Sequence, residues 1–248
     1  MTGAPPTLVR LDRVGSTMDA LHELAQAGAP AGTAVVAGEQ TAGRGSRGRS
    51  WSSPRGGLWV SVLARPRGAG LEVLSLRVGL AVAEQLDRLG AGARVGLKWP
   101  NDLMLDDRKV GGILCEARWQ GGALAWVVLG LGLNVTNAPP AELAAIATWL
   151  ASALPGVGPA DLVEPVVAVL RGVDAEAGPL TDDERARFAQ RDWLRGRALE
   201  APTAGTAAGL AADGALLVRR PDGTTAAVRA GTVGLAGTSA TADLRPCS

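Results

Sequence analysis

The sequence lacks the features that mark several classes of protein. No apolar run reaches the ~18–20 residues that a membrane-spanning helix needs, and residues 1–13 have no basic flank followed by an apolar stretch, so no secretory signal is predicted. The net charge is only +1, which gives no reason to expect nucleic acid or a membrane as partner. The two cysteines, Cys115 and Cys247, are far apart; they predict neither a disulfide framework nor a metal site and favour the cytoplasm.

Lysine is nearly absent as well. Of the 25 lysine and arginine residues only two are lysine, Lys98 and Lys109, and both fall in one twelve-residue stretch. One explanation is a bias in genomic base composition, which also fits the abundance of arginine, alanine and glycine. The positions of the two lysines would then be due to chance. Arginine does not replace lysine where a compact charge must reach a single atom. We therefore consider that this stretch requires an ammonium group.

The residue pattern predicts an α+β fold with a mixed β-sheet and flanking helices. Strands are predicted at residues 7–13, 33–37, 58–63, 95–99, 103–105, 110–117 and 124–129. Helices are predicted from Ser16 or Thr17 to about residue 27, and at residues 71–89, 141–152, 160–173 and 181–194. The last of these opens with the capping box Thr181 and Glu184.

The residue pattern of the sequence changes near residue 197. Short β-like runs are separated there by Asp213-Gly214 and Asp222-Gly223, both typical hairpin turns. The sequence therefore predicts two domains, a larger domain at 1–196 and a small all-β domain at 197–248.

A long loop with alternating glycine and arginine, residues 43–49, is the first candidate for chemistry. Six arginines and no acidic residue lie between residues 40 and 71. Glycines let backbone amides approach a ligand, and guanidinium forks grip carboxylate or phosphate oxygens. The alternative is a disordered basic linker or an RNA-binding segment. Because the loop is short and lies between strands, we predict an anion-binding loop, although it matches neither a P-loop nor a Rossmann fingerprint.

Three further motifs carry polar or small residues at strand ends. KWPNDL at 98–103 reads as a turn between strands. In RKVGGIL at 108–114, Lys109 opens an apolar strand and can point into a cleft, or can simply protect an edge strand from aggregation. GLGLN at 130–134 is weak evidence by itself, although Asn134 could bind a ribose or a base.

Together these motifs resemble the bacterial biotin protein ligases. The resemblance rests on Ser16-Thr17, QTAGRG at 40–45, RSW at 49–51 with Ser53-Pro54, KWPNDL, RKVGGIL and GLGLN, in the family's order and spacing. It implies a catalytic domain of the biotin/lipoate ligase type and a C-terminal SH3-like β-barrel. Since the catalytic pattern begins almost at Met1, it also implies a short form without the N-terminal DNA-binding domain of larger members.

The resemblance implies a two-step reaction. Biotin and ATP, with Mg²⁺, first give biotinyl-5′-AMP and pyrophosphate, and the acyl group then passes to a lysine of the biotin carboxyl carrier domain of an acyl-CoA carboxylase. No resident metal site, nucleic acid or membrane partner is expected, and the chain is expected to be a monomer or a homodimer.

The resemblance also assigns residues. Catalytic roles fall on Lys109, Arg44 and Arg49. Biotin or nucleotide contacts fall on Ser16, Thr17, Met18, Gln40, Gly43, Arg44, Gly45, Ser46, Arg49, Trp51, Lys98, Asn101, Asp102, Lys109, Gly112, Gly130 and Asn134. Among these, Lys109 should bridge the biotin carboxylate and the α-phosphate, and Trp51 should pack near adenine.

Two positions depart from the family pattern. Met18 stands where the family has asparagine, which removes one hydrogen bond to biotin. Ser46 stands where the second arginine of GRGR is expected, and that arginine helps to retain the intermediate. We therefore predict weaker retention of biotinyl-5′-AMP, with Arg47 as the candidate to replace the missing charge.

Three other readings remain open at this point. A lipoate ligase is compatible with the same fold, although the GRG and KWPND motifs argue against it. A non-catalytic biotin binder is compatible with Met18 and Ser46. A nucleic-acid-binding module would use the basic loop and would bind in a salt-sensitive manner without ATP turnover.

Overall fold

The computed structural model describes residues 5–66, 71–90 and 94–237, so Cys247 lies outside the described residues. Its centre is a seven-stranded mixed sheet in the order β1-β2-β3-β7-β6-β5-β4, in which only β1 and β2 are parallel neighbours. The strands are β1 (Leu8–Val14), β2 (Ala34–Gln40), β3 (Gly57–Ala64), β4 (Gly96–Lys98), β5 (Asp102–Leu105), β6 (Arg108–Gln120) and β7 (Ala123–Asn134). The prediction of a mixed sheet is confirmed.

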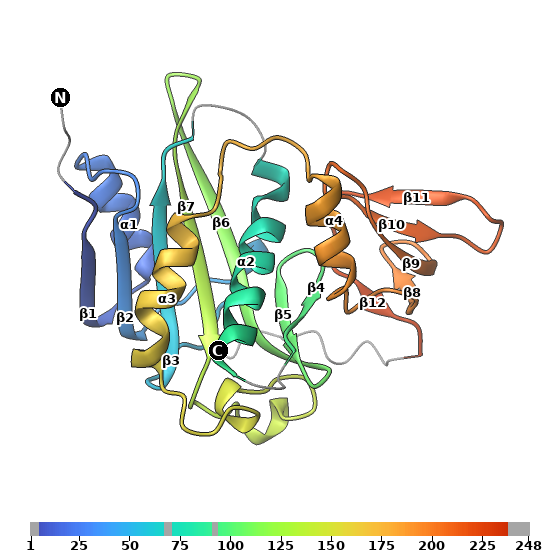
Figure 1. Cartoon of the computed structure of the whole chain (residues 1–248), viewed down its shortest axis with the longest axis horizontal. Coiled ribbons are helices and arrows are strands. Elements are labelled where there is room, and N and C mark those ends of the chain that lie inside the picture. The colour runs from blue at the N-terminus through green and yellow to red at the C-terminus, as the bar shows by residue number, and fades with distance from the viewer. Residues whose placement is uncertain (1–4, 67–70, 91–93, 238–248) are drawn as a thin grey trace.

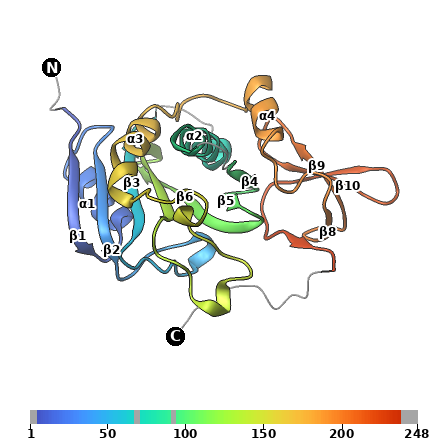
Figure 2. The ribbon, with the colours of Figure 1, turned by 60° about the horizontal axis from the view of Figure 1, so that its bottom comes forward.

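Helices cover both faces of this sheet, as the alternation of apolar side chains requires. In β2, Ala34 and Val36 pack into the core on the side of α2 (Leu74–Leu89) and α3 (Pro159–Arg171). Val35 packs on the opposite side, with residues of α1 (Thr17–Gln26). Figure 1 shows α2 and α3 side by side over one face of the sheet, and Figure 2 shows α2 nearly end-on above the strands.

A second, antiparallel sheet follows α4 (Asp182–Ala189) and lies beside β4 (Figure 2). Its strands have the order β11-β10-β9-β8-β12. They are β8 (Ala198–Ala201), β9 (Gly205–Leu210), β10 (Leu216–Arg219), β11 (Thr225–Val228) and β12 (Gly234–Leu235). The hairpin turn at Asp222-Gly223 is confirmed, with Gly223 at φ +84°. The described strands fit an SH3-like module but form an open row rather than a closed barrel.

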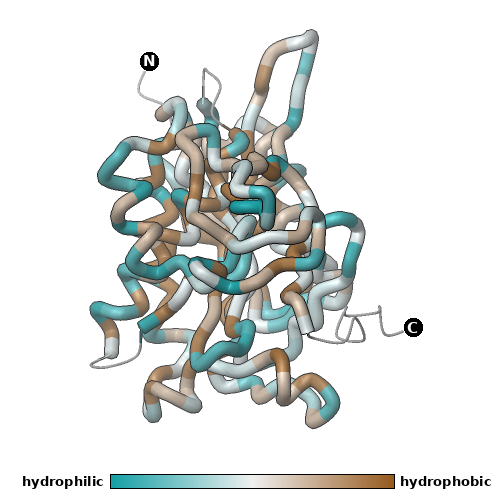
Figure 3. The backbone as a smooth tube through the Cα atoms, turned by 90° about the vertical axis from the view of Figure 1, so that its right-hand side faces the viewer, coloured by the Kyte–Doolittle hydropathy of each residue, from teal (hydrophilic) through white to brown (hydrophobic). Residues whose placement is uncertain are grey.

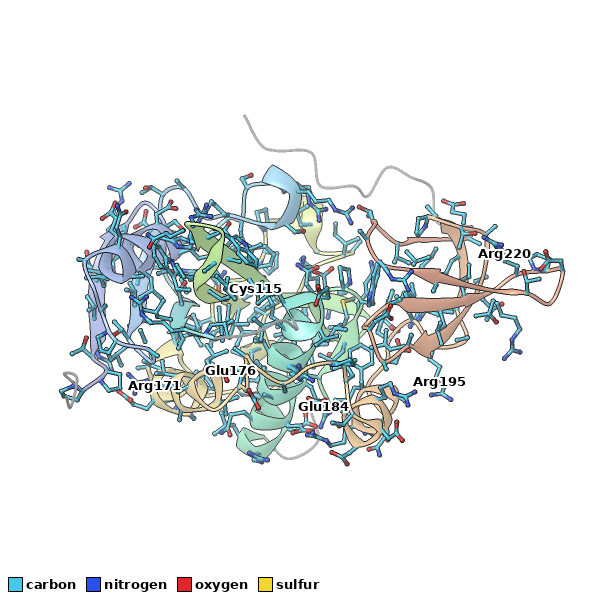
Figure 4. The ribbon with its side chains drawn as sticks, turned by 90° about the horizontal axis from the view of Figure 1, so that it is seen from above. Cys115, Arg171, Glu176, Glu184, Arg195 and Arg220 are labelled. Atoms are coloured by element: carbon cyan, nitrogen blue, oxygen red, sulfur yellow. The ribbon has the colours of Figure 1, made fainter. Side chains whose placement is uncertain are left out.

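The two sheets share one continuous hydrophobic core. The indole N–H of Trp99, just after β4, donates to the carbonyl of Gly214 at 2.9 Å. Arg77 of α2 is buried and donates to Glu184 of α4 and to the carbonyls of Ala177 and Pro179. Figure 4 labels Glu184 on α4, beside α2. The division at residue 196 stays a prediction.

Several predicted boundaries differ from the structure. The prediction of a helix at 141–152 is wrong, because the segment has two short 3₁₀ turns, Ala141–Leu143 and Leu150–Ser152. Between them the chain extends along β6, because Lys109 N–H donates to Ile146 and Lys109 accepts from Thr148 N–H. These tertiary hydrogen bonds override the local helical pattern.

Two other helices are shorter than predicted. The helix predicted at 71–89 starts with a 3₁₀ turn at Leu71–Val73, so α2 begins only at Leu74. The helix predicted at 181–194 ends at Ala189, because the backbones of Arg191 and Trp193 pair with Leu97 of β4.

The β6–β7 hairpin is longer than predicted and extends past the rest of the sheet (Figure 1). Figure 3, coloured by residue hydropathy, shows hydrophilic and hydrophobic residues interspersed along the chain. Within the described ranges, no helix combines the length and the apolar character needed to cross a bilayer.

Candidate active site

A pocket opens on the face of the main sheet that α1 partly covers. It lies between the beginning of α1, the loop that follows β2, and the middle of β6 and β7. Its lining residues are Ser16, Thr17, Met18, Gln40, Arg44, Gly45, Ser46, Arg49, Ser50, Trp51, Val60, Ser61, Asn101, Lys109, Gly112, Ile113, Leu114, Gly130, Leu131 and Gly132.

Glycines of the two central strands form the floor. Gly130 and Gly132 are two residues apart in β7 and therefore share a face. A Cβ at Gly130 would lie 2.8 Å from Sδ of Met18, and one at Gly132 would lie 2.7 Å from Nε1 of Trp51. Gly112 of β6 pairs with Gly132. The glycines thus make room for two large side chains that form the wall of the pocket.

A buried polar cluster lies at one end. Thr17 donates to the side-chain oxygen of Gln40 from its backbone N–H at 2.8 Å and from its hydroxyl at 3.0 Å. The hydroxyl of Ser61 lies 2.9 Å from that of Thr17. Ser16 caps α1 by accepting from Met18 N–H at 3.3 Å. These contacts fix the polar groups in place before any ligand arrives.

The glycine- and arginine-rich loop is folded against itself. Gly45 N–H donates to the carbonyl of Arg49 at 2.7 Å, and Trp51 N–H donates to that of Gly43 at 2.8 Å. Gly43 has no room for a side chain, since a Cβ would lie 2.4 Å from Oγ of Ser53. The disordered-linker reading of this segment is therefore wrong.

Lys109 reaches the middle of the pocket. Its Nζ lies 2.6 Å from a carboxylate oxygen of Asp102 and 4.9 Å from the centre of the Trp51 ring. The indole N–H of Trp51 is buried and has no acceptor among the described residues.

Arg44 of the loop is held by two carboxylates. Its Nη2 lies 2.9 Å from Asp19 of α1 and 3.1 Å from Glu116 of β6. Its Nε is buried without an acceptor in the described part of the chain. One end of the guanidinium is therefore anchored, while the other end retains a donor.

Arg47 points away from the pocket. It adopts φ 62°, and its side chain donates to the hydroxyl of Thr232, beside the second sheet. Ser46 does line the pocket. The proposal that Arg47 replaces the missing arginine is not supported by this arrangement.

Four of the predicted site residues lie outside the pocket lining. They are Gly43, Lys98, Asp102 and Asn134. Asp102 still contacts the pocket through Lys109. Asn134 donates to the carbonyl of Thr148 and accepts from Asn137, so its amide holds the end of β7.

Lys98 lies close to the second sheet. Its Nζ is 5.2 Å from the centre of the Trp193 ring. Burial lowers the pKa of Lys98, as do the nearby cations Lys109, Arg197 and Arg49, while Asp102 raises it.

The site residues assigned from the resemblance do not include every lining residue. The unpredicted ones are Ser50, Val60, Ser61, Ile113, Leu114, Leu131 and Gly132. The twofold period of a strand would have found Gly132 from Gly130. Ser61 is a lone polar residue in an apolar strand, and its meaning depends on Thr17, which is distant in the sequence.

Fold and pocket together define a class of protein. A mixed sheet with a glycine floor, a cationic loop and a buried polar end suits an enzyme that joins a small acid to a nucleotide. The family model of the biotin/lipoate A/B protein ligase family matches residues 11–134, half of the chain. The chain belongs to this family.

Individual relatives agree with this assignment. The biotin–[acetyl-CoA-carboxylase] ligase of Mycobacterium tuberculosis is 42% identical over 134 residues, which cover 51% of this chain and 48% of that protein. The chain spans about half the length of the curated relatives that it matches.

Solved structures match over nearly the whole chain. The biotin protein ligase of Aquifex aeolicus in complex with biotin and ATP superposes with a TM-score of 0.76 at 27% identity, covering 92% of this chain and 97% of that one. The biotin protein ligase of Leishmania major in complex with biotinyl-5-AMP gives 0.63 at 30% identity, covering 91% and 99%.

Proposed function

We propose that the chain is a biotin protein ligase. It activates biotin with MgATP to form biotinyl-5′-AMP and pyrophosphate, and it then transfers the biotinyl group to a lysine of a carrier domain. The observation that carries the proposal is the position of Lys109. Its ammonium lines the same pocket as the polar cluster and lies over the ring of Trp51, where it can reach a carboxylate and an α-phosphate.

The polar end is suited to the head group of biotin. A cyclic urea offers one strong acceptor and two N–H donors, and the cluster of Thr17, Gln40 and Ser61 offers both kinds of partner. Met18 adds an apolar, polarizable wall for the sulfur-containing ring. Because this cluster is already hydrogen-bonded, little ordering cost remains on binding.

In the first step a carboxylate oxygen of biotin attacks the α-phosphorus, and the bond from this phosphorus to pyrophosphate breaks. Two anions must approach each other, so cations aimed at the developing charge supply the stabilisation. Lys109 does this at the point of attack, and Arg44 and Arg49 do so from the loop. Asp102, which now pairs with Lys109, orients the ammonium.

The nucleotide is expected over the glycine floor. The Trp51 ring packs on Gly112 and Gly132 and provides an aromatic face for adenine. The mixed anhydride is sensitive to water, so a loop that orders further over it would protect it.

In the second step the amine of the carrier lysine attacks the acyl carbon. A C–N bond forms, AMP leaves, and the amine loses its proton to solvent. The carrier is proposed to be the biotin carboxyl carrier domain of an acyl-CoA carboxylase, in line with the name of the Mycobacterium tuberculosis relative.

Incubation of the purified chain with MgATP, an acid and a carrier domain tests the proposal. Biotin-dependent pyrophosphate exchange and mass-shifted carrier are expected, with lipoate inactive. Turnover with lipoate alone would make the chain a lipoate ligase, and biotin binding without exchange would make it a non-catalytic binder. Salt-sensitive binding to RNA with no exchange would favour the nucleic-acid module.

A further inference from the structure

His22 is the sole histidine of the chain, and the proposed mechanism does not use it. It lies on α1 with 9% of its surface exposed. Its Nδ1 faces the indole N–H of Trp126 at 2.9 Å, and its Nε2 faces Glu116 at 3.1 Å. It therefore connects the core of the α1 face to the carboxylate that holds Arg44.

The neighbours of His22 determine which of its two ring nitrogens carries the proton. Tryptophan can only donate, so Nδ1 must accept from Trp126 and the ring proton must sit on Nε2. From Nε2 it is donated to Glu116. Burial, with Arg118 and Arg44 nearby, lowers the pKa of His22 despite Glu116, so the ring is neutral at physiological pH.

One carboxylate oxygen of Glu116 accepts hydrogen bonds from both His22 and Arg44. Oε2 lies 3.1 Å from Nε2 of His22 and 3.1 Å from Nη2 of Arg44. Arg118 lies farther away, at 3.8 Å, and is half exposed. The other carboxylate on Arg44, Asp19, is also half exposed. Among the described residues, His22 is the buried side chain that makes a short contact with this carboxylate.

We propose that His22 is a positioning residue for Arg44, acting through Glu116. The chain of contacts runs from Trp126 to His22, to Glu116 and to the guanidinium, whose Nε–H has no acceptor among the described residues. A fixed Glu116 holds Nη2 of the guanidinium and so keeps Arg44 in the pocket that it lines, where its charge faces the anionic intermediate. The inference rests on the proposed function.

The test measures release of biotinyl-5′-AMP from the preloaded enzyme. His22→Leu removes the donor, and we expect release about tenfold faster, the effect of one lost hydrogen bond. His22→Gln retains an amide donor for Glu116 and should restore slow release. Glu116→Leu removes the acceptor of both donors while leaving the contact between His22 and Trp126 in place, and should release the intermediate at least as fast as His22→Leu.

A double-mutant cycle separates positioning from a general structural role. In an Arg44→Ala background His22→Leu should add nothing, because the group that it positions is gone. Unchanged release in His22→Leu, or an undiminished effect in the Arg44→Ala background, would overturn the inference. If His22→Leu does not fold, Glu116→Leu and its double mutant with Arg44→Ala decide in the same way. Absence of biotin-dependent exchange in the wild type would instead overturn the proposed function.

Discussion

Lys109 has a well-defined position at the scale of the residue. It pairs with Asp102 and lies over Trp51, so its ammonium is fixed in the pocket before substrate arrives. We predict that Lys109→Ala slows biotin-dependent pyrophosphate exchange by about 10²–10³-fold, the usual effect of removing a group aimed at developing charge.

The companion measurement is the thermal midpoint, which should stay close to that of the wild type because the pair is partly exposed. Lys109→Arg should not restore the rate, since a planar fork does not place its charge where the ammonium stood. Normal exchange and transfer by Lys109→Ala would remove the residue from its assigned role.

A second prediction for a single residue concerns Ser46 and the release of biotinyl-5′-AMP. The residue lines the pocket, and Arg47 is engaged with Thr232, so Arg47 does not take over the missing charge. Ser46→Arg should therefore slow release of biotinyl-5′-AMP by about tenfold, the effect of one charge-assisted hydrogen bond. Ser46→Gln, which is long but neutral, serves as the control and should release at the wild-type rate. Equal release from Ser46→Arg and wild type would count against the idea.

Single residues were predictable where the sequence places them next to a local signal. Lys109 follows a tight turn, with Asp106 and Asp107 at positive φ, and Ser16 is the N-cap of α1. His22 and Arg47 were not predictable, because their partners Glu116 and Thr232 are distant in the sequence and are brought close only by the fold.

At the scale of the element, β7 was predicted to end at residue 129, just before Gly130 and Gly132, whereas it runs to Asn134. In the sheet, Gly111 pairs with Leu133 and Gly112 with Gly132. The long pairing with neighbours on both sides overrides the low strand propensity of glycine. The same glycines leave space for the pocket, so the weak strand signal and the functional site have one cause.

Gly132→Ala tests this floor directly. The new Cβ would lie 2.7 Å from Nε1 of Trp51, so the indole must move off the strand. We predict that the KM for ATP rises at least about tenfold, since stacking on an aromatic ring contributes ~1–3 kcal/mol per base, while circular dichroism stays unchanged.

The matched control for Gly132→Ala is Gly178→Ala. Gly178 has a negative or extended φ and nothing within 4 Å of an added Cβ, so its kinetics should equal those of the wild type. An unchanged KM for ATP in Gly132→Ala would mean that Trp51 does not need its place on the floor.

At the scale of the whole molecule, the small sheet is joined to the large one by a shared core and by specific hydrogen bonds. The sequence predicted both parts from local patterns and hairpin turns. It could not predict that Trp99 of the KWPND motif reaches Gly214 across the junction, because nothing local to either residue indicates the other. Joint unfolding in one transition is the physical consequence of a continuous core.

Trp99→Phe tests this coupling. Trp99 is 3% exposed, and phenylalanine keeps most of the apolar ring but leaves the carbonyl of Gly214 without its donor. An unsatisfied buried acceptor costs about 1–3 kcal/mol, so the free energy of unfolding in urea should fall by that amount. A single transition with an unchanged m-value is expected, because the surface exposed on unfolding stays the same.

Trp119→Phe provides the control, since Trp119 is 61% exposed and a surface substitution of this kind changes stability by less than about 0.5 kcal/mol. Two separate transitions in Trp99→Phe would show that the sheets unfold independently once this hydrogen bond is lost. Equal stability of the two variants would instead mean that the contact between Trp99 and Gly214 contributes nothing to holding the modules together, and that the shared apolar core alone couples them.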